Sequence, residues 1–177
     1  INIVDPAPVP TLTSSQPTNT FCSGTSVTFT AAGGALYNFR VNGISVQSGA
    51  SLTFVSSSLV NGDVVDVIVT SASGCSATSA GITNTVLALP VATLSSSDAD
   101  NLICAGTSVT FTAGGGTSYN FRINGTSVQN GASSTYTTAT LTTGQVVDVI
   151  VTNAGGCSST SAGITTTVTT PPSATIS

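Results

Sequence analysis

A gapless internal repeat of 82 residues is the feature that most constrains how this chain can fold. When the sequence is shifted by that length, residues 8–89 and 90–171 are identical at 52 of 82 positions. A fixed period of this kind is typical of arrays in which one structural unit recurs. We therefore expect two copies of one domain, named here the first module (8–89) and the second module (90–171). Residues 1–7 match the end of a repeat and 172–177 match the start of one, so a longer array is expected.

Each module is organised around one apolar run. Residues 64–70 read Val-Val-Asp-Val-Ile-Val-Thr, and the same seven residues return at 146–152. A short run of β-branched residues between turn signals is typical of a buried strand. The run therefore predicts the central strand of each module.

Alternation of apolar and hydroxyl side chains predicts further strands around the central one, with one face turned to a core and the other to water. Asn42-Gly43 follows one alternating segment and is typical of a type I′ hairpin turn. In the first module, strands are predicted at 9–15, 25–31, 37–41, 44–47, 52–55, 64–70 and 82–87. About seven short strands with frequent turns predict an all-β fold, with two tandem immunoglobulin-like Greek-key β-sandwich domains.

Charged residues are too few for several classes of function. The chain has two basic residues, both arginines, six acidic residues, all aspartates, and no His. Two arginines cannot form the clustered basic surface that nucleic-acid binding requires. General acid–base catalysis and an activated Cys nucleophile need partners that this composition lacks. We therefore expect a protein that is not an enzyme and that needs no cofactor and no metal.

Four cysteines occupy equivalent positions in the two modules. Cys22 and Cys75 are 53 positions apart, as are Cys104 and Cys157. Cysteines that bind zinc normally come in pairs two to four residues apart, so disulfides are the better interpretation. We expect one disulfide within each module, joining an end loop to the hairpin after the central strand. Such bonds indicate an oxidising, extracytoplasmic setting.

Arg40 and Asp66 recur as Arg122 and Asp148. Their strand phase places both members of each pair on the outer face of adjacent strands. We expect structural cross-strand ion pairs, and a ligand-binding arginine is the alternative.

Three weaker motifs leave other functions open. Residues 98–101, Asp-Ala-Asp-Asn, resemble part of a calcium loop, although calcium takes six to eight oxygens. Residues 124–126, Asn-Gly-Thr, match the N-glycosylation triplet but coincide with a hairpin turn. Threonine triplets of the kind found on ice-binding surfaces occur at 28–30, 83–85 and 165–167. A solvated loop, turn chemistry and strand alternation are the simpler explanations.

The modules are joined by residues 87–91, Leu-Ala-Leu-Pro-Val. This segment is short and apolar and contains Pro90, unlike flexible linkers rich in Gly and Ser. We therefore expect a stiff, end-to-end junction. No apolar run approaches the roughly 20 residues of a membrane-spanning helix, so we expect no membrane insertion in this segment.

Four strings of the first module, which the second module repeats with Ile123 in place of Val41 and Gln145 in place of Asp63, resemble a known family. They are Cys-x-Gly-Thr-Ser-Val-Thr-Phe-Thr-Ala, Tyr-Asn-Phe-Arg-Val-Asn-Gly, Gly-Asp-Val-Val-Asp-Val-Ile-Val-Thr and a following Gly-Cys. Together they resemble the tandem immunoglobulin-like repeats of giant Bacteroidetes surface proteins, which include gliding-motility adhesins exported by the type IX secretion system. The resemblance covers both modules. It implies an extracellular filament or stalk attached to the outer membrane at the cell surface, and it brings no catalytic residues.

The expected function is that of a structural stalk or spacer repeat in a large surface adhesin. Its expected partners are neighbouring repeats of the same chain or filament, with surface polysaccharide or a substratum as further candidates. One alternative is a module that itself binds carbohydrate or a surface, although the aromatic residues alternate with polar ones as core residues do. A second alternative is a subunit that polymerises by strand exchange, for which residues 1–4 would supply a strand.

Overall fold

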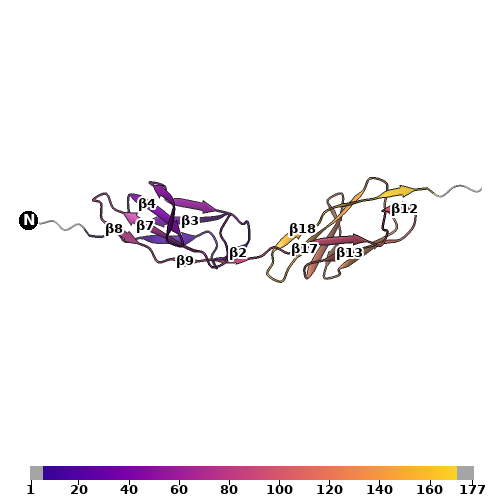
Figure 1. Cartoon of the computed structure of the whole chain (residues 1–177), viewed down its shortest axis with the longest axis horizontal. Coiled ribbons are helices and arrows are strands. Elements are labelled where there is room, and N and C mark those ends of the chain that lie inside the picture. Colours follow the sequence, from indigo (N-terminus) through magenta and orange to yellow (C-terminus); the bar gives the residue numbers. More distant parts are fainter. Residues whose placement is uncertain (1–5, 171–177) are drawn as a thin grey trace, which may run out of the picture. The chain divides into compact units, whose positions relative to one another are not determined.

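The computed structural model describes residues 6–170, and the chain divides into two compact units, Ile1–Ala88 and Leu89–Ser177. All regular elements of the described residues are strands (Figure 1). The division falls within one residue of the boundary between the two sequence repeats. The expected ends of further repeats, at 1–7 and 172–177, lie outside the described residues apart from residues 6 and 7.

The two modules have the same series of ten short strands. The first module contains β1 (Thr11–Ser14), β2 (Thr20–Cys22), β3 (Val27–Ala32), β4 (Leu36–Val41), β5 (Ile44–Gly49), β6 (Thr53–Ser56), β7 (Val64–Thr70), β8 (Ser76–Thr78), β9 (Ile82–Thr83) and β10 (Thr85–Leu87). The second module contains β11 (Thr93–Ser96), β12 (Leu102–Cys104), β13 (Val109–Gly114), β14 (Ser118–Ile123), β15 (Thr126–Gly131), β16 (Thr135–Thr138), β17 (Val146–Thr152), β18 (Ser158–Thr160), β19 (Ile164–Thr165) and β20 (Thr167–Thr169).

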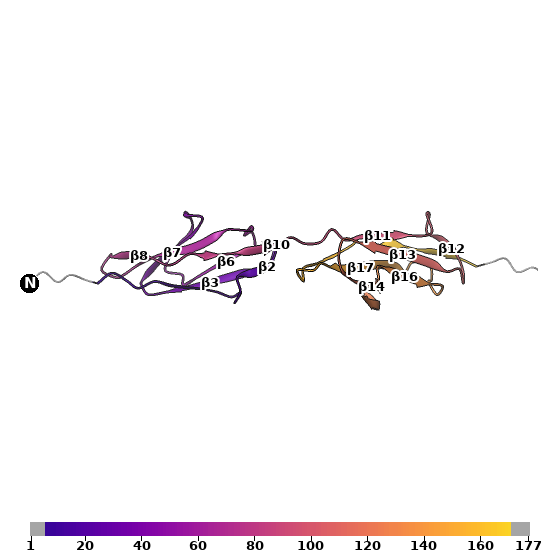
Figure 2. The ribbon, with the colours of Figure 1, turned by 90° about the horizontal axis from the view of Figure 1, so that it is seen from below.

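The strands of each module form a β-sandwich. One sheet of the first module has the order β1-β3-β6, and the other has the order β5-β4-β7, with β8 and β9 both pairing with β7. A parallel pair, β2 and β10, completes the module. The second module repeats this arrangement with β11 to β20 (Figure 2). The predicted fold class is therefore confirmed: the chain is all-β, with two tandem immunoglobulin-like domains.

Strand β7 lies at the centre of the larger sheet, and its inward side chains form the middle of the core. Val65, Val67 and Val69 are all fully buried, while the alternate residues of β7 are half-buried. Phe29 from β3 and Phe39 from β4 belong to the same core cluster and are also fully buried. Strand β17 has the same burial pattern in the second module. The repeated run is thus the central buried strand in each module, as its β-branched composition predicts.

The hairpin between β4 and β5 has the predicted turn. Asn42 and Gly43 have φ angles of 51° and 79°, and a type I′ turn requires positive φ at both central positions. Asn124 and Gly125 repeat this geometry, with φ angles of 50° and 78°. Two residues that tolerate positive φ therefore set the register of each hairpin.

Three features of the strand layout differ from the prediction, and the first is β8 (Ser76–Thr78), a strand where none was predicted. Residues 16–24, which lie between two predicted strands, contain β2, whose Phe21 is buried in the core. The strand predicted at 82–87 is divided into β9 and β10 at Asn84, whose Nδ2 donates to the carbonyls of Asp63 and Ile82. A three-residue strand that pairs in parallel with a distant partner leaves little trace in local sequence periodicity.

The chain enters and leaves the first module at opposite ends of β7. The Thr70 carbonyl, at the last residue of β7, accepts a hydrogen bond from Ala35 N at 2.8 Å, and β1 begins opposite nearby Ala32. Before the first residue of β7, the Asp63 carbonyl accepts from Asn84 N at 2.9 Å, and β10 follows. Seven strand residues span about 20 Å. We name the Thr70 end of β7 the N-terminal end of the module and the Asp63 end its C-terminal end. In Figure 2, β8 marks the first and β10 marks the second.

Candidate functional site

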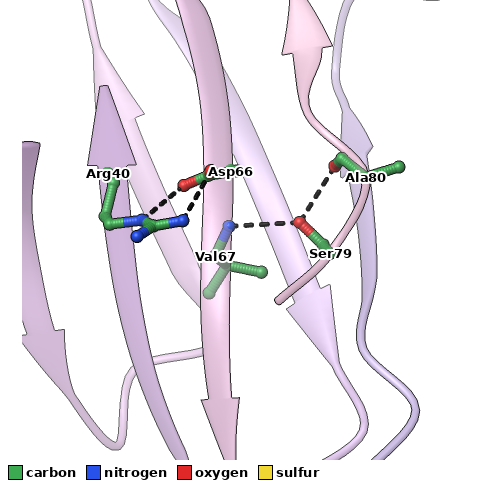
Figure 3. A network of polar contacts seen from close by, with 5 residues as sticks. All are labelled: Arg40, Asp66, Val67, Ser79 and Ala80. Carbon is green, nitrogen blue, oxygen red and sulfur yellow. Dashed lines mark hydrogen bonds and ion pairs between the residues drawn. The ribbon is translucent and has the colours of Figure 1, made fainter. Parts of the chain in front are cut away.

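Arg40 on β4 and Asp66 on β7 lie directly opposite each other on the larger sheet. Arg40 Nε donates to Asp66 Oδ1 and Nη2 donates to Oδ2, each at 2.7 Å (Figure 3). The side chains are 23% and 19% exposed. Hydrogen bonding to Asp66 raises the pKa of Arg40 above its ordinary value, while partial desolvation opposes this rise and the charge of Asp66 adds to it. Two parallel bonds to a carboxylate fix the planar guanidinium on the sheet surface.

Arg122 and Asp148 form the same pair in the second module. Nε and Nη2 of Arg122 each donate to a carboxylate oxygen of Asp148 at 2.7 Å, and hydrogen bonding again raises the pKa of the arginine. A ligand that used either arginine would have to displace the carboxylate that is already bound. The arrangement therefore favours the structural role over the ligand-binding alternative.

Beside the ion pair, a serine hydroxyl takes a place in the hydrogen-bond ladder of β7. Ser79 Oγ accepts from Val67 N at 3.1 Å and donates to the Ala80 carbonyl at 2.9 Å (Figure 3). Ser79 N donates to the Val67 carbonyl at 2.9 Å. These bonds bridge the interruption between β8 and β9, and Ser161 forms the corresponding bonds with Val149.

Two polar groups that hold the central strand were not predicted from the sequence. One is Ser79, whose segment Thr-Ser-Ala-Gly recurs unchanged at 160–163 and was a usable signal. The other is Asn42, whose Oδ1 accepts from Val64 N at 3.0 Å while its Nδ2 donates to Asp63 Oδ1 at 2.8 Å. The turn asparagine therefore also fastens the hairpin to the start of β7.

Cys22 and Cys75 lie at opposite ends of the first module, which corrects the predicted bond between them. Cys22 ends β2 and pairs with Leu87 of β10 at the C-terminal end. Cys75 lies in the hairpin between β7 and β8, where its carbonyl accepts from Ser71 N at 2.8 Å. Figure 1 shows β2 and β8 at the two ends of the module. The length of β7, about 20 Å, separates these positions, whereas a disulfide needs Cα atoms within about 7 Å.

The second module gives the same correction. Cys157 is disulfide-bonded and fully buried, whereas Cys104 is exposed and is not disulfide-bonded. The predicted bond between Cys104 and Cys157 is therefore absent from the described residues, because β12 and the hairpin after β17 lie at opposite ends of the sandwich. Cys22 is also disulfide-bonded.

The loop at residues 98–101 is organised by its own hydrogen bonds. Leu102 N donates to Asp100 Oδ1 and Asp98 N donates to Ser96 Oγ, each at 3.1 Å. The hydrogen bond from Leu102 N lowers the pKa of Asp100 below its ordinary value, and a hydrogen bond with the Asp98 side chain lowers it further. Within residues 6–170, no three His, Cys, Asp or Glu side chains gather in a way that could hold a metal ion.

The glycosylation and ice-binding motifs lie in regular structural positions. Asn124 Oδ1 accepts from Val146 N at 2.9 Å, so this asparagine serves the hairpin as Asn42 does. The threonine triplets fall on separate strands: one on β3, one across β9 and β10, and one across β19 and β20. Turn chemistry and strand alternation account for both motifs.

All nine aromatic side chains are buried or half-buried. The ring of Phe54 lies 6.1 Å from that of Phe29 and 5.8 Å from that of Phe39, measured between centroids. Tyr136 and Phe121 form a similar contact at 5.8 Å in the second module. These rings fill the cores and present no flat exposed platform for stacking on sugars.

A groove with both apolar and polar lining residues, Ser56 and Asp63 among the polar ones, lies at the edge of the first module between β5 and β6. It has a volume of about 450 Å³ and is lined by residues that include Val41, Val46, Phe54 and Val55. Val46 and Val55 are about half exposed, at 47% and 55%. The groove is large enough for an apolar side chain or a small ligand.

No protein-family model matches the chain, and no curated protein matches it by sequence. Several solved structures resemble it. The fibronectin(III)-like modules of Clostridium thermocellum CbhA are 12% identical, with a TM-score of 0.46 over 89% of this chain and 95% of that one. A structure of a 1.5-MDa bacterial ice-binding adhesin is 18% identical, with a TM-score of 0.42 over 94% of this chain and 67% of that one. Murine CEACAM1b is 10% identical, with a TM-score of 0.42 over 91% of this chain and 100% of that one.

In the described part of the chain, no helix has the length and apolar character of a membrane span. The solved structures that resemble it are immunoglobulin-like and fibronectin-III-like modules, a bacterial adhesin among them.

Proposed function

We propose that this chain is a spacer segment of a large extracellular surface protein, with modules arranged in series along one chain. The observation that carries the proposal is the position of the chain ends in each module. The chain enters at the Thr70 end of β7 and leaves at the Asp63 end. Domains often have their two termini close together. Termini at opposite ends instead let each module add its length to the chain.

The surface chemistry supports a passive role. Two arginines are the only basic residues, and each is bound to an aspartate. The aromatic side chains are in the cores, and the chain has no His, Lys or Glu. The presence of disulfide-bonded cysteines favours an extracytoplasmic setting. Each of these observations fits a module that serves through its shape and carries out no reaction.

We propose further that the parent protein is a repetitive adhesin of the Bacteroidetes gliding-motility type, attached to the outer membrane and facing the exterior. The repeated strings around Cys22, Asn42, Val64 and Cys75 support this assignment through their resemblance to such repeats. In this reading the partners of the chain are the neighbouring repeats, and another part of the protein contacts polysaccharide or substratum.

A replacement experiment tests the spacer function. In the native host, both modules are exchanged for two unrelated immunoglobulin-like domains of similar length, and in a second strain residues 8–171 are deleted. A spacer predicts that adhesion and surface exposure survive the exchange and that only the deletion changes the reach of the protein. Loss of adhesion after the exchange, with normal surface exposure, would show that these modules bind something themselves.

The groove of the first module favours one other candidate, a module that binds a surface directly. Val55, which lines the groove, is an exposed apolar residue, and its counterpart in the second module is Thr137. Binding of the isolated chain to polysaccharide or to abiotic surfaces, lost after Val55→Thr, would support this alternative.

A further inference from the structure

The groove between β5 and β6 of the first module combines apolar side chains with the carboxylate of Asp63. We propose that this groove docks a lysine side chain of a partner protein. The alkyl stem of the lysine lies on the apolar wall, and its ammonium group pairs with Asp63. This inference goes beyond the spacer function, which does not depend on it.

Val46 faces the groove because of a bulge in β5. Phe39 of β4 lies opposite Gln47, and the next residue of β4 lies opposite Ser45. Val46 is therefore an extra residue with no partner on β4. Bulges of this kind are frequent at sheet edges, where they change the direction of a side chain. Val46 is 47% exposed and lines the groove.

Val55 of β6 also belongs to the apolar wall. It occupies an outward position opposite Thr28 of β3 and is 55% exposed. The equivalent residue of the second module, Thr137, shares a hydrogen bond between hydroxyl groups with Thr110 at 2.8 Å. A threonine therefore satisfies the fold at this position, and the stability of the module does not explain an exposed valine.

The same comparison separates the structural role of Asp63 from its charge. Asp63 Oδ2 accepts a hydrogen bond from Val60 N at 2.9 Å. In the second module, Gln145 Oε1 accepts from Thr142 N at the same distance. A neutral amide therefore fills this structural role, and the loop does not require the negative charge of Asp63.

Among residues 6–170, no ion pair neutralises the charge of Asp63. Arg40 and Arg122 are each bound to another aspartate, and the chain has no lysine. A second copy of this chain could offer an arginine only by breaking one of those ion pairs. The complementary group is therefore a cation on a different protein.

A lysine side chain matches this combination of an apolar wall and one carboxylate. Its four-carbon stem packs on apolar surface while its charged head stays at a polar or hydrated position. Each carboxylate oxygen of Asp63 already accepts one hydrogen bond, from Asn42 Nδ2 and from Val60 N. This favours the compact ammonium of lysine over the planar guanidinium of arginine, which binds best to two free oxygens.

The groove lies between two sheet edges that can receive an extended segment. Both β5 and β6 are end strands of their sheets. Gln47 Nε2 donates to the Thr53 carbonyl at 2.7 Å, and this bond joins the two edges beside Val46. A partner segment can therefore run along an edge that is already in place, as in strand addition, and put its lysine into the groove.

An NMR titration of the intact two-module chain tests the proposal. The probe is the peptide acetyl-Val-Lys-Val-amide, and its control carries Nε-acetyl-lysine, which keeps the stem and removes the charge. We expect the lysine peptide to shift the backbone amide signals of Val46, Val55 and Asp63, while the signals of the second module stay in place. Acetylation of the lysine should weaken binding by about fivefold, the upper limit for an exposed ion pair.

The second module supplies matched substitutions. Asp63→Gln and Val55→Thr each introduce the residue found there, and each should reduce the shifts. Asp63→Gln should also remove the difference between the two peptides. In the reverse direction, Thr137→Val combined with Gln145→Asp should make the second module respond to the lysine peptide.

Three results would overturn the proposal: equal affinity for the two peptides, equal shifts in both modules, and no shifts at the solubility limit of the lysine peptide. Shifts at the groove with dextran, a polysaccharide, and none with the peptide would overturn it too and would support direct surface binding instead. The comparison of the two peptides on the wild-type chain decides the question even where a variant folds poorly. None of these results bears on the spacer function, which the exchange of both modules tests.

Discussion

Arg40 Nη2 lies 2.7 Å from Asp66 Oδ2, and Arg122 and Asp148 repeat that distance in the second module. In both modules the arginine comes from the strand beside the central strand and the aspartate from the central strand itself. The pairs join adjacent strands on their outer faces, and they are the sites where charge is concentrated on an otherwise hydroxyl-rich sandwich.

Removal of Arg40 is expected to destabilise the first module alone. Arg40→Ala leaves the Asp66 carboxylate without its two donors, so the melting temperature of the first module should fall by a few degrees while that of the second is unchanged. In the double variant Arg40→Ala/Asp66→Ala, the melting temperature of the first module should fall by less than the sum of the falls in the two single variants. Arg122→Ala is the matched control, and it should lower the melting temperature of the second module while leaving that of the first unchanged. Equal destabilisation of both modules would contradict this expectation.

The same pair fixes a pH dependence. Because the folded pKa of Arg40 is raised above its ordinary value, its contribution is fully present below that strongly basic value and is lost only as pH rises through the folded pKa. The effect of Arg40→Ala on the melting temperature should therefore be constant between pH 6 and pH 10. A steep change in that range would show that another group controls the pair.

Ser79→Ala is expected to leave the buried Val67 N–H without its acceptor. A buried donor that loses its partner costs about 1–3 kcal/mol, so the free energy of unfolding of the first module should fall by that amount. Chemical denaturation followed by NMR measures each module separately. Ser161→Ala should do the same in the second module, whereas Ser73→Ala, in an exposed loop, should have little effect. No change for Ser79→Ala would mean that water or a backbone shift replaces the hydroxyl.

Asn84 and Thr166 allow a reciprocal exchange. Both side chains are buried at the division of the last strand, at 1% and 0% exposed. Asn84 Oδ1 has no hydrogen-bond partner in the described structure, whereas Thr166 Oγ1 lies near the carbonyls of Thr142 and Gln145. Asn84→Thr should therefore raise the stability of the first module, by about 1 kcal/mol, and Thr166→Asn should lower that of the second. Destabilisation by Asn84→Thr would show that the two Nδ2 hydrogen bonds matter more.

Asp100 is expected to titrate below its ordinary range. Its carboxylate accepts from Leu102 N, and its pKa is lowered. A lowered folded pKa means that the stabilisation is present above the unfolded value of about 3.8 and is lost as pH falls through the folded value. Carbon-13 NMR titration should place its midpoint below that of an aspartate in a short peptide. An unshifted midpoint would show that the loop hydrogen bonds do not persist in solution.

Local patterns were sufficient to predict the main elements of the fold. The run at 64–70 identified the central strand, because β-branched residues on a pleated strand bury alternate side chains on one face. Asn42-Gly43 identified the hairpin turn, because few other residue pairs tolerate positive φ twice. Strand phase likewise placed Arg40 and Asp66 on the same outer face, where the structure has them opposite each other.

Features that depend on distant contacts were not predictable in this way. The equal spacing of Cys22 to Cys75 and of Cys104 to Cys157 suggested bonds within modules, but spacing does not reveal at which end of a sandwich a residue lies. Strand β2 was missed because its partner β10 is far along the chain. The role of Ser79 was missed because it depends on where β8 and β9 break, which is decided by packing against β7.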